Sequence, residues 1–230
     1  MKTPKTAAWS ASGLEPGIDG LTILGQLGQS VDGQIATATG QSKYINGQAG
    51  LLHLHRLRNW ADVVVVGVGT LVADNPKLNV RLIAGKSPAR LVIDPNARSP
   101  RDAVCLIDQS VRRVILTKPE AGTVDWPAGV EQQKFDGFLR DGRIDMDQFR
   151  VWMVSQGWRR VLVEGGATTL AGFLAAGCLD YLHLITSPLM LGPGVAGIRG
   201  EHLARLADAR RFKARSFGLG DDLLIECAFQ

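Results

Sequence analysis

The stretch DVVVVGVGTLVADNP, residues 62–76, decides the fold class of this chain. Residues 62–67 are interpreted as a strand, because four consecutive valines form its centre. A continuous β-branched run is typical of a strand that is buried on both faces, as in a parallel sheet. Gly67 and Gly69 follow at once and resemble half of the dinucleotide-binding fingerprint G-x-G-x-x-G. The stretch therefore predicts an α/β fold.

Two residues separate this stretch from the complete fingerprint. Val72 stands where the third glycine belongs, and Pro76 leaves little room for a long crossover helix. We therefore expect a loop that brings Thr70 and Asp74 to the carboxyl end of a central strand. Ligands bind at this end of the strands in open α/β sheets.

A second strand with a glycine turn lies at VLVEGGATTL, residues 161–170. Glycines at 165 and 166 let a ligand approach the backbone, and a helix is expected to begin directly after them. The first turn of that helix would offer unpaired N–H groups and a positive dipole end. This combination suits the pyrophosphate of a dinucleotide, although a tight strand-to-helix turn explains the same residues.

Strand-like and helix-like segments alternate along the rest of the chain. Further strands are expected at 21–27, 90–94, 113–117, 181–187, 213–218 and 223–228, and helices at 47–60, 145–156 and 168–176. Asp145 caps the second of these helices, and Gly157 ends it. The alternation predicts one α/β domain with a mixed sheet at residues 21–230, after a loosely ordered leader at 1–20.

The composition fits a globular protein with a full core. The chain has 230 residues, of which 45% are hydrophobic and 21% are charged. No apolar run approaches the roughly 20 residues of a membrane span, and the first 20 residues do not resemble a signal peptide. We therefore expect a cytoplasmic protein. The three cysteines, Cys105, Cys178 and Cys227, have apolar neighbours and are expected to be buried structural thiols.

The net charge of +4 comes largely from the segment 199–215. This segment holds six Lys or Arg residues against two acidic ones, which predicts a solvated surface segment. It also leaves open attraction of phosphates, or a non-catalytic protein that binds nucleotides or nucleic acid. The segment has no pattern of interleaved aromatic residues that would indicate stacked bases.

Several catalytic motifs are missing from the sequence. A zinc deaminase requires H-x-E with P-C-x-x-C, which the chain lacks. His53 and His55 would point about 200° apart on a helix, so they are not expected to share a metal. There is also no G-x-S-x-G, Walker A lysine or paired-carboxylate motif. Hydride transfer fits this pattern, because the cofactor supplies the reacting atom.

Phosphate recognition has three candidate groups. Ser42 lies in SKYING, residues 42–47, ahead of the first helix, and Arg58 and Arg81 offer forked donors. Each arginine taken singly is better explained by a surface salt bridge. The turn SVDGQIA, residues 30–36, is interpreted as a hairpin or loop.

Taken in order, these motifs resemble the reductase domain of bifunctional bacterial riboflavin biosynthesis proteins. The matching segments are SVDGQIA (30–36), SKYING (42–47), HRLRNWADVVVVGVGTLVADNPKLNVRL (55–82), RLVID (90–94), VLVEGGATTLAGFLAAGCLD (161–180) and PLMLGPG (188–194). The resemblance implies a dihydrofolate-reductase-like, three-layer α/β/α fold with a mixed, mainly parallel sheet. It also implies a homodimer, and because the usual deaminase partner domain is missing, a stand-alone reductase.

The resemblance further implies NADPH as the cofactor and a ribosylaminopyrimidine 5′-phosphate as the substrate. A hydride would reach the sugar C1′, through an imine form, and open the ring to a ribityl chain. The implied cofactor residues are Gly28, Tyr44, Thr70, Asp74, Gly165, Gly166, Ala167, Thr168, Thr169 and Leu170, within a segment that continues to Gly172. The implied substrate residues are Ser42, Arg58, Leu78, Arg81 and Glu164. Glu164 and Asp74 are the catalytic candidates.

Two positions depart from the family pattern. Gln26 stands where relatives usually have Lys, or Asn in some stand-alone proteins, and Tyr44 replaces the usual Trp. The leading substrate is the deaminated compound, 5-amino-6-(5-phosphoribosylamino)uracil. The still-aminated 2,5-diaminopyrimidine phosphate and dihydrofolate or a pterin-like compound remain alternatives, and a phosphate-free substrate would not need both arginines.

Overall fold

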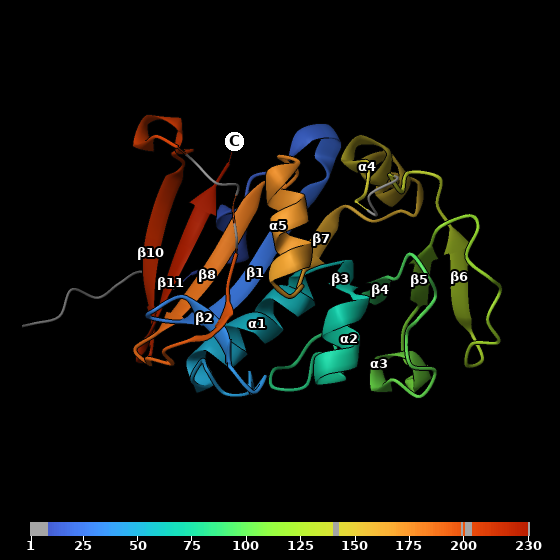
Figure 1. Ribbon diagram of the computed structural model, residues 1–230, viewed down its shortest axis with the longest axis horizontal. Helices are drawn as coiled ribbons and strands as arrows, with labels where there is room; N and C mark the ends of the chain where they lie inside the picture. Colours follow the sequence, from blue (N-terminus) through green and yellow to red (C-terminus); the bar gives the residue numbers. More distant parts are fainter. Residues whose placement is uncertain (1–8, 140–142, 199, 201–203, 230) are drawn as a thin grey trace, which may run out of the picture.

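A nine-stranded sheet forms the centre of the protein (Figure 1). The computed structural model describes residues 9–139, 143–198, 200 and 204–229. The strands of this sheet are β1 (Thr22–Ser30), β3 (Val63–Gly67), β4 (Ala89–Ile93), β5 (Arg113–Thr117), β6 (Val130–Lys134), β7 (Arg160–Val163), β8 (Tyr181–Ser187), β10 (Lys213–Leu219) and β11 (Asp222–Ala228). The helices are α1 (Gln48–Trp60), α2 (Val68–Asp74), α3 (Val104–Ile107), α4 (Met146–Ser155) and α5 (Ala167–Ala175).

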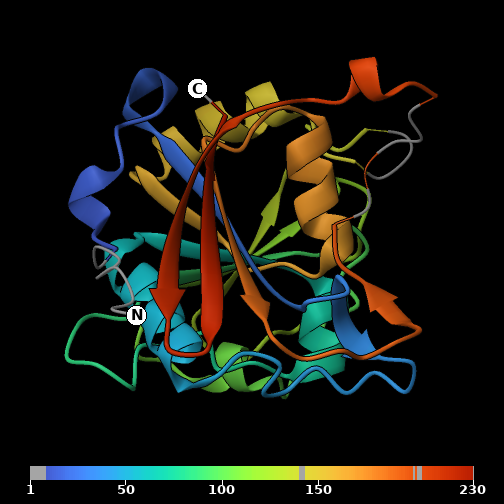
Figure 2. The same ribbon diagram turned by 90° about the vertical axis from the view of Figure 1, so that its left-hand side faces the viewer.

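The sheet is mixed and mainly parallel, as the sequence predicts. Its strand order is β10-β11-β8-β1-β7-β3-β4-β5-β6. Every neighbouring pair from β8 to β6 is parallel, and only β11 runs against its two neighbours, β8 and β10. The β10–β11 hairpin forms one edge of the sheet (Figure 2). The valines of β3 are fully buried, because helices cover both faces of the central strands.

Helices pack on both faces of the sheet and make three layers (Figure 1). On one face, Leu57 of α1, Leu71 of α2 and Leu106 of α3 pack against strand residues. On the other face, Phe149 of α4 and Phe173 of α5 belong to a second cluster, and their rings meet edge to face. The α/β fold class is confirmed.

The expected loop after β3 is wrong, because residues 68–74 form the short helix α2. Thr70 and Asp74 therefore lie on a helix rather than on a loop. Pro76 prevents a long helix, since its ring would collide with the preceding turn, but it leaves room for two turns before it. Asn75 ends the helix in the left-handed conformation, with φ of 40°.

The sequence does not predict a second, two-stranded sheet. Here β2 (Gln34–Thr37) pairs antiparallel with β9 (Gly194–Ala196), so residues 30–36 do not form a simple hairpin with β1 (Figure 2). The carboxylate of Asp32 joins these segments, because it accepts hydrogen bonds from the amides of Leu191 (3.2 Å) and Gly192 (2.8 Å). These bonds also lower the pKa of Asp32, after the larger effect of the Ser30 hydroxyl.

Buried polar groups distinguish α1 from an ordinary amphipathic helix. Its buried residues include His53, His55 and Arg58, whereas Leu51 and Leu54 are only half-buried. Polar side chains therefore form much of the buried face of this helix. The partners of its polar side chains come from distant strands and loops, as described below.

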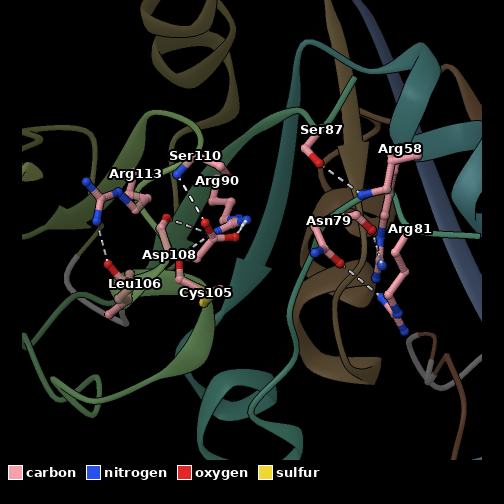
Figure 3. Close-up of polar contacts among 11 residues, drawn as sticks. Arg58, Asn79, Arg81, Ser87, Arg90, Cys105, Leu106, Asp108, Ser110 and Arg113 are labelled. Atoms are coloured by element: carbon pink, nitrogen blue, oxygen red, sulfur yellow. Dashed lines mark hydrogen bonds and ion pairs between the residues drawn. The ribbon is translucent and has the colours of Figure 1, made fainter. Parts of the chain in front are cut away.

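Two buried arginines brace the start of neighbouring strands β4 and β5 (Figure 3). Arg90 donates to the carbonyls of Cys105 and Asp108 and pairs with the Asp108 carboxylate at 2.5 Å. Arg113 donates to the carbonyl of Leu106 at 2.7 Å. These bonds satisfy carbonyls at the carboxyl end of α3, which lack partners within the helix. They fix the crossover from β4 to β5.

The predicted leader falls partly outside the described residues, which begin at Trp9. The Trp9 indole donates to Glu226 (2.7 Å), and its ring packs edge-on against His53 and His183. The three cysteines are buried and unpaired, as predicted. Part of the basic segment also lies outside the description, but Arg215 pairs with Glu226. None of the described helices has the length and apolar character needed to cross a bilayer.

Candidate functional site

A buried ion pair joins two of the site candidates that the sequence predicts, Arg58 and Glu164. Arg58 of α1 binds Glu164, which directly follows β7, through two parallel hydrogen bonds of 2.7 Å (Nε to Oε1) and 2.6 Å (Nη2 to Oε2). The side chains are 6% and 10% exposed. Forked arginine–carboxylate pairs of this kind fix orientation as well as charge. The carboxylate of Glu164 is therefore held in one direction.

The backbone holds Glu164 at the carboxyl edge of the sheet. Its amide donates to the carbonyl of Val65 (2.9 Å), which continues the ladder between β7 and β3 by one residue. Arg58 also donates through Nη1 to the carbonyl of Asn79 (3.1 Å). Because these donors are occupied, Arg58 in this structure orients Glu164, and its assignment to a phosphate stays a prediction.

Arg81 presents a second guanidinium near that of Arg58 (Figure 3). It is exposed, and its Nη1 donates to the side-chain oxygen of Asn79 at 3.1 Å. Partial burial and the charge of Arg58 lower the pKa of Arg81, whereas Glu164 and the nearby Tyr44 raise it. Among the residues that the structure describes, only Arg58 of these two guanidiniums is paired with a carboxylate, which favours an anion at the exposed Arg81.

The segment 42–47 meets the end of α2 through a pair that the sequence assigns to different ligands. The Ser42 hydroxyl donates to the carboxylate of Asp74 at 3.0 Å. Tyr44 is 83% exposed and adopts a left-handed conformation with φ of 67°. An exposed ring in a strained turn is available to stack against a flat ligand.

Gly28 has a packing reason of its own. A Cβ atom there would lie 1.8 Å from the side-chain oxygen of Asn46. Asn46 in turn donates to the carbonyl of Ile185 in β8 (3.2 Å). Gly28 thus allows the segment 42–47 to lie against the sheet. Gln26, two residues earlier, is buried in β1 opposite His183.

The glycine turn after β7 packs closely against α2 and β3. The amide of Gly166 donates to the hydroxyl of Thr70 at 2.9 Å. Cβ atoms added at Gly67 and Gly165 would lie 2.4 and 2.5 Å from atoms of Thr169. Only glycines allow this approach of α5 to the strand ends. The two glycine motifs found in the sequence therefore form one surface.

The amino end of α5 has free hydrogen-bond donors. Gly166 is the N-cap, and no side chain caps the helix. The first amides of a helix have no partner within it, and in the described part of the chain those of Ala167 and Thr168 have none elsewhere. The space above Gly166, here called the cradle, is open because glycine has no side chain. A Cβ atom at this residue would enter it and would lie 3.3 Å from the hydroxyl of Thr70. Free amides and open space suit a phosphate group.

A cavity on the outer side of α2 contains a residue that the sequence analysis missed. The cavity is about 250 Å³ and is lined by Val68, Gly69, Val72, Ala73 and Arg98. Arg98 is exposed and lies in the turn that follows β4. Its position after a parallel strand is the signal that would have found it. A larger cavity of about 560 Å³ lies between α5 and the β10–β11 hairpin and contains none of the predicted site residues.

The structure also adds His55 to the site. Its Nδ1 accepts a hydrogen bond from the backbone amide of Arg81 (3.1 Å), so this nitrogen carries no proton and the ring is neutral. The residue is only 1% exposed. Burial lowers the pKa of His55 to about 4, assisted by the charges of Arg58 and Arg81. Its helix neighbour His53 instead meets His183 (3.0 Å), so the two histidines have separate surroundings.

These histidines predict loss of stability in mild acid. In the unfolded chain each histidine has a pKa of about 6.5, whereas in the folded protein the pKa is about 4 for His55 and about 3 for His53. Between these values the unfolded chain binds more protons than the folded protein, so acid favours unfolding. Their contribution is complete above pH 6.5 and declines as the pH falls. We expect the melting temperature to fall between pH 6.5 and 5, and less steeply in His55→Asn. Equal slopes in the two proteins would contradict the neutral assignment of His55.

The comparison with protein families gives one match over most of the chain. Residues 22–218 match the RibD C-terminal domain. The chain is 31% identical over 203 residues to 2,5-diamino-6-ribosylamino-4(3H)-pyrimidinone 5′-phosphate reductase of Methanothermobacter thermautotrophicus, covering 86% of this chain and 93% of that protein. It is also 31% identical over 205 residues to riboflavin biosynthesis protein RibD of Aquifex aeolicus, covering 86% of this chain but 54% of that protein. The chain thus spans about half the length of this RibD relative.

Solved structures agree on the fold. A deaminase/5-amino-6-(5-phosphoribosylamino)uracil reductase of Thermotoga maritima aligns with a TM-score of 0.79 at 24% identity, covering 90% of this chain and 56% of that one. The riboflavin biosynthesis reductase Rib7 of Saccharomyces cerevisiae aligns with a TM-score of 0.72 at 19% identity, covering 94% and 93%. At these identities the likeness concerns the fold alone. The expected three-layer α/β fold with a mixed, mainly parallel sheet is confirmed.

Proposed function

We propose, because this chain belongs to the RibD C-terminal domain family, that it reduces a ribosylaminopyrimidine 5′-phosphate of riboflavin biosynthesis with NADPH. The observation that supports this most is the arrangement around Glu164. Its carboxylate is fixed by Arg58, next to the amino end of α5 and near the exposed guanidinium of Arg81. One site thus combines an oriented acceptor, a candidate cofactor cradle and an anion site.

The glycine surface fits the pyrophosphate of NADPH. The free amides of α5 and the space above Gly166 meet phosphate oxygens without a side chain in between. Arg98 and the cavity beside α2 offer a cation for the additional phosphate of this cofactor. When bound, NADPH supplies a hydride, and the protein's own contribution is to hold the sugar C1′ about 3–3.5 Å from the reacting carbon.

Glu164 orients the sugar or the pyrimidine in this proposal. A carboxylate accepts hydrogen bonds from hydroxyl and amino groups, and the sugar and the pyrimidine of the substrate offer such donors. Arg58 keeps the carboxylate in place, so no reorganisation is needed when the substrate binds. Asp74, held by Ser42, and the exposed ring of Tyr44 lie on the rim of the site.

Arg81 binds the 5′-phosphate in this proposal, and its replacement tests that role. Arg81→Ala is expected to raise KM for the phosphorylated substrate by about 10- to 100-fold, because a charge-assisted bond contributes about 1.5–3 kcal/mol. Its kcat should change little. Initial rates with the dephosphorylated compound provide the control, and KM for that compound should not change. An equal rise in KM for both compounds would contradict the phosphate role.

The leading substrate is the deaminated 5-amino-6-(5-phosphoribosylamino)uracil, reduced at the ribose C1′ to the ribitylamino product. The second candidate is the 2,5-diamino compound, because the Methanothermobacter relative named for it matches this chain over 93% of its own length. NADPH consumption at 340 nm, with each pyrimidine phosphate and with dihydrofolate in parallel, tests the assignment. Turnover of one pyrimidine supports the proposal and selects between them. Turnover of dihydrofolate alone would overturn it.

A further inference from the structure

The loop that presents Arg81 has no regular secondary structure, so only specific contacts, here called ties, can hold it in place. Residues 78–81 belong to no helix or strand. Leu78 anchors the start of the loop, because it is only 1% exposed although its φ is 52°. A left-handed conformation is unfavourable for leucine and persists only where packing enforces it. The next three residues have no such core anchor, since they are half-buried or exposed.

Three side chains hold three consecutive residues of this loop through the backbone. Arg58 donates to the carbonyl of Asn79 (3.1 Å), the hydroxyl of Ser87 accepts from the amide of Val80 (3.0 Å), and Nδ1 of His55 accepts from the amide of Arg81 (3.1 Å). The residues Arg58, Asn79, Arg81 and Ser87 lie together in Figure 3. The loop is thus fixed by side chains in place of regular secondary structure.

The position of the Arg81 guanidinium depends on these backbone ties. Its side chain has one hydrogen-bond partner in the described part of the chain, the amide oxygen of Asn79, which belongs to the same loop. A partner within the loop moves with the loop. The hydrogen bond that the Arg81 amide donates to His55 fixes the peptide nitrogen of Arg81 itself to helix α1.

We propose that His55 is a positioning residue for phosphate recognition: its Nδ1 holds the backbone of Arg81 so that the guanidinium faces the 5′-phosphate. This inference rests on the proposed function and adds a residue to it. Ser87, which holds the preceding amide, assists in the same way.

The surroundings of His55 keep it an acceptor. The ring is buried on α1 with the cationic Arg58 and Arg81 as its charged neighbours, and both disfavour a second proton. A buried imidazole without a polar task is costly compared with an apolar side chain of similar size. If the residue only had to fill space, leucine would pack equally well. The hydrogen bond that Nδ1 accepts therefore distinguishes a positioning role from simple packing.

Two variants of His55 test the proposal. His55→Leu keeps the volume and removes the acceptor, whereas His55→Asn places an amide oxygen near the position of Nδ1. We expect His55→Leu to raise KM for the phosphorylated pyrimidine by about tenfold, at the upper end for one neutral hydrogen bond. Its kcat, its KM for NADPH and its KM for the dephosphorylated pyrimidine should stay within about twofold. His55→Asn should recover most of the loss, and Ser87→Ala should shift KM in the same direction as His55→Leu.

Hydrogen exchange gives a readout that does not depend on activity. The amide of Arg81 should exchange faster in His55→Leu than in the unchanged protein and in His55→Asn, at equal protection of α1. Unchanged exchange of the Arg81 amide would overturn the positioning role. A KM shift that is the same for the phosphorylated and the dephosphorylated pyrimidine would overturn it as well. If the unchanged protein turns over neither pyrimidine phosphate, the proposed function fails and the recognition role fails with it, while the exchange data still report whether the tie exists.

Discussion

Replacing Glu164 with Gln is expected to lower kcat by about a hundredfold and to leave the Kd for NADPH within about threefold. The substitution keeps the size of the side chain but removes its charge. Glutamine offers one oxygen where the carboxylate offers two, so it cannot accept both bonds from Arg58. The buried guanidinium then lacks its counter-charge, and the acceptor for the substrate loses its orientation. A hundredfold loss corresponds to about 2.7 kcal/mol of transition-state stabilisation.

The matched control is Glu131→Gln. Glu131 forms the same forked pair with Arg112, at 2.8 and 2.7 Å, but at a more exposed position on β6. Steady-state rates and NADPH titrations of both variants separate a site effect from a general effect of losing an ion pair. Glu131→Gln should have the kcat of the unchanged protein. Full activity of Glu164→Gln would remove Glu164 from the site.

Replacing Gly166 with Val is expected to raise the Kd for NADPH by about a hundredfold. The backbone at this residue has φ of −62° and ψ of 171°, a conformation that any residue adopts, so the substitution acts through space rather than through backbone strain. The Cβ atom of the new valine would lie 3.3 Å from the hydroxyl of Thr70, and its two methyl groups would project into the cradle. Both the phosphate site and the bond from the Gly166 amide to Thr70 are disturbed. A hundredfold change in Kd corresponds to about 2.7 kcal/mol.

Titration of NADPH by fluorescence measures this effect directly. Gly122→Val is the control, because a Cβ at Gly122 meets no atom within 4 Å and the residue lies in the connection between β5 and β6. Its Kd for NADPH should equal that of the unchanged protein. A normal Kd in Gly166→Val, with a normal melting temperature, would place the pyrophosphate elsewhere.

The strands were predictable where the local pattern decides the structure. The expected bounds 113–117 and 181–187 coincide with β5 and β8. In both cases apolar side chains dominate a short run and the strand is buried within the sheet, so burial alone selects the conformation. The cap of α4 was equally local: the Asp145 side chain accepts from the amide of Gln148, three residues on.

Long-range pairing was not predictable in the same way. The strands β2 and β9 pair across about 160 residues of sequence, and nothing within either segment specifies the other. Arg58 and Glu164 were both selected from the sequence, but as separate ligands of the substrate rather than as partners. A polar residue on a helix is expected to face water, and it becomes a buried one only because a distant strand supplies its counter-charge. His55 escaped notice because its partner, the backbone amide of Arg81, lies in a distant loop.

The most direct test uses NADPH in which both hydrogens at C4 of the nicotinamide are deuterium. The purified protein is mixed with this cofactor and with 5-amino-6-(5-phosphoribosylamino)uracil or its 2,5-diamino counterpart, and the product is examined by mass spectrometry and NMR. The proposed function predicts one deuterium at C1′ of a ribitylamino product for each NADPH oxidised. Deuterium at any other position, or no oxidation of NADPH with either pyrimidine, would contradict it.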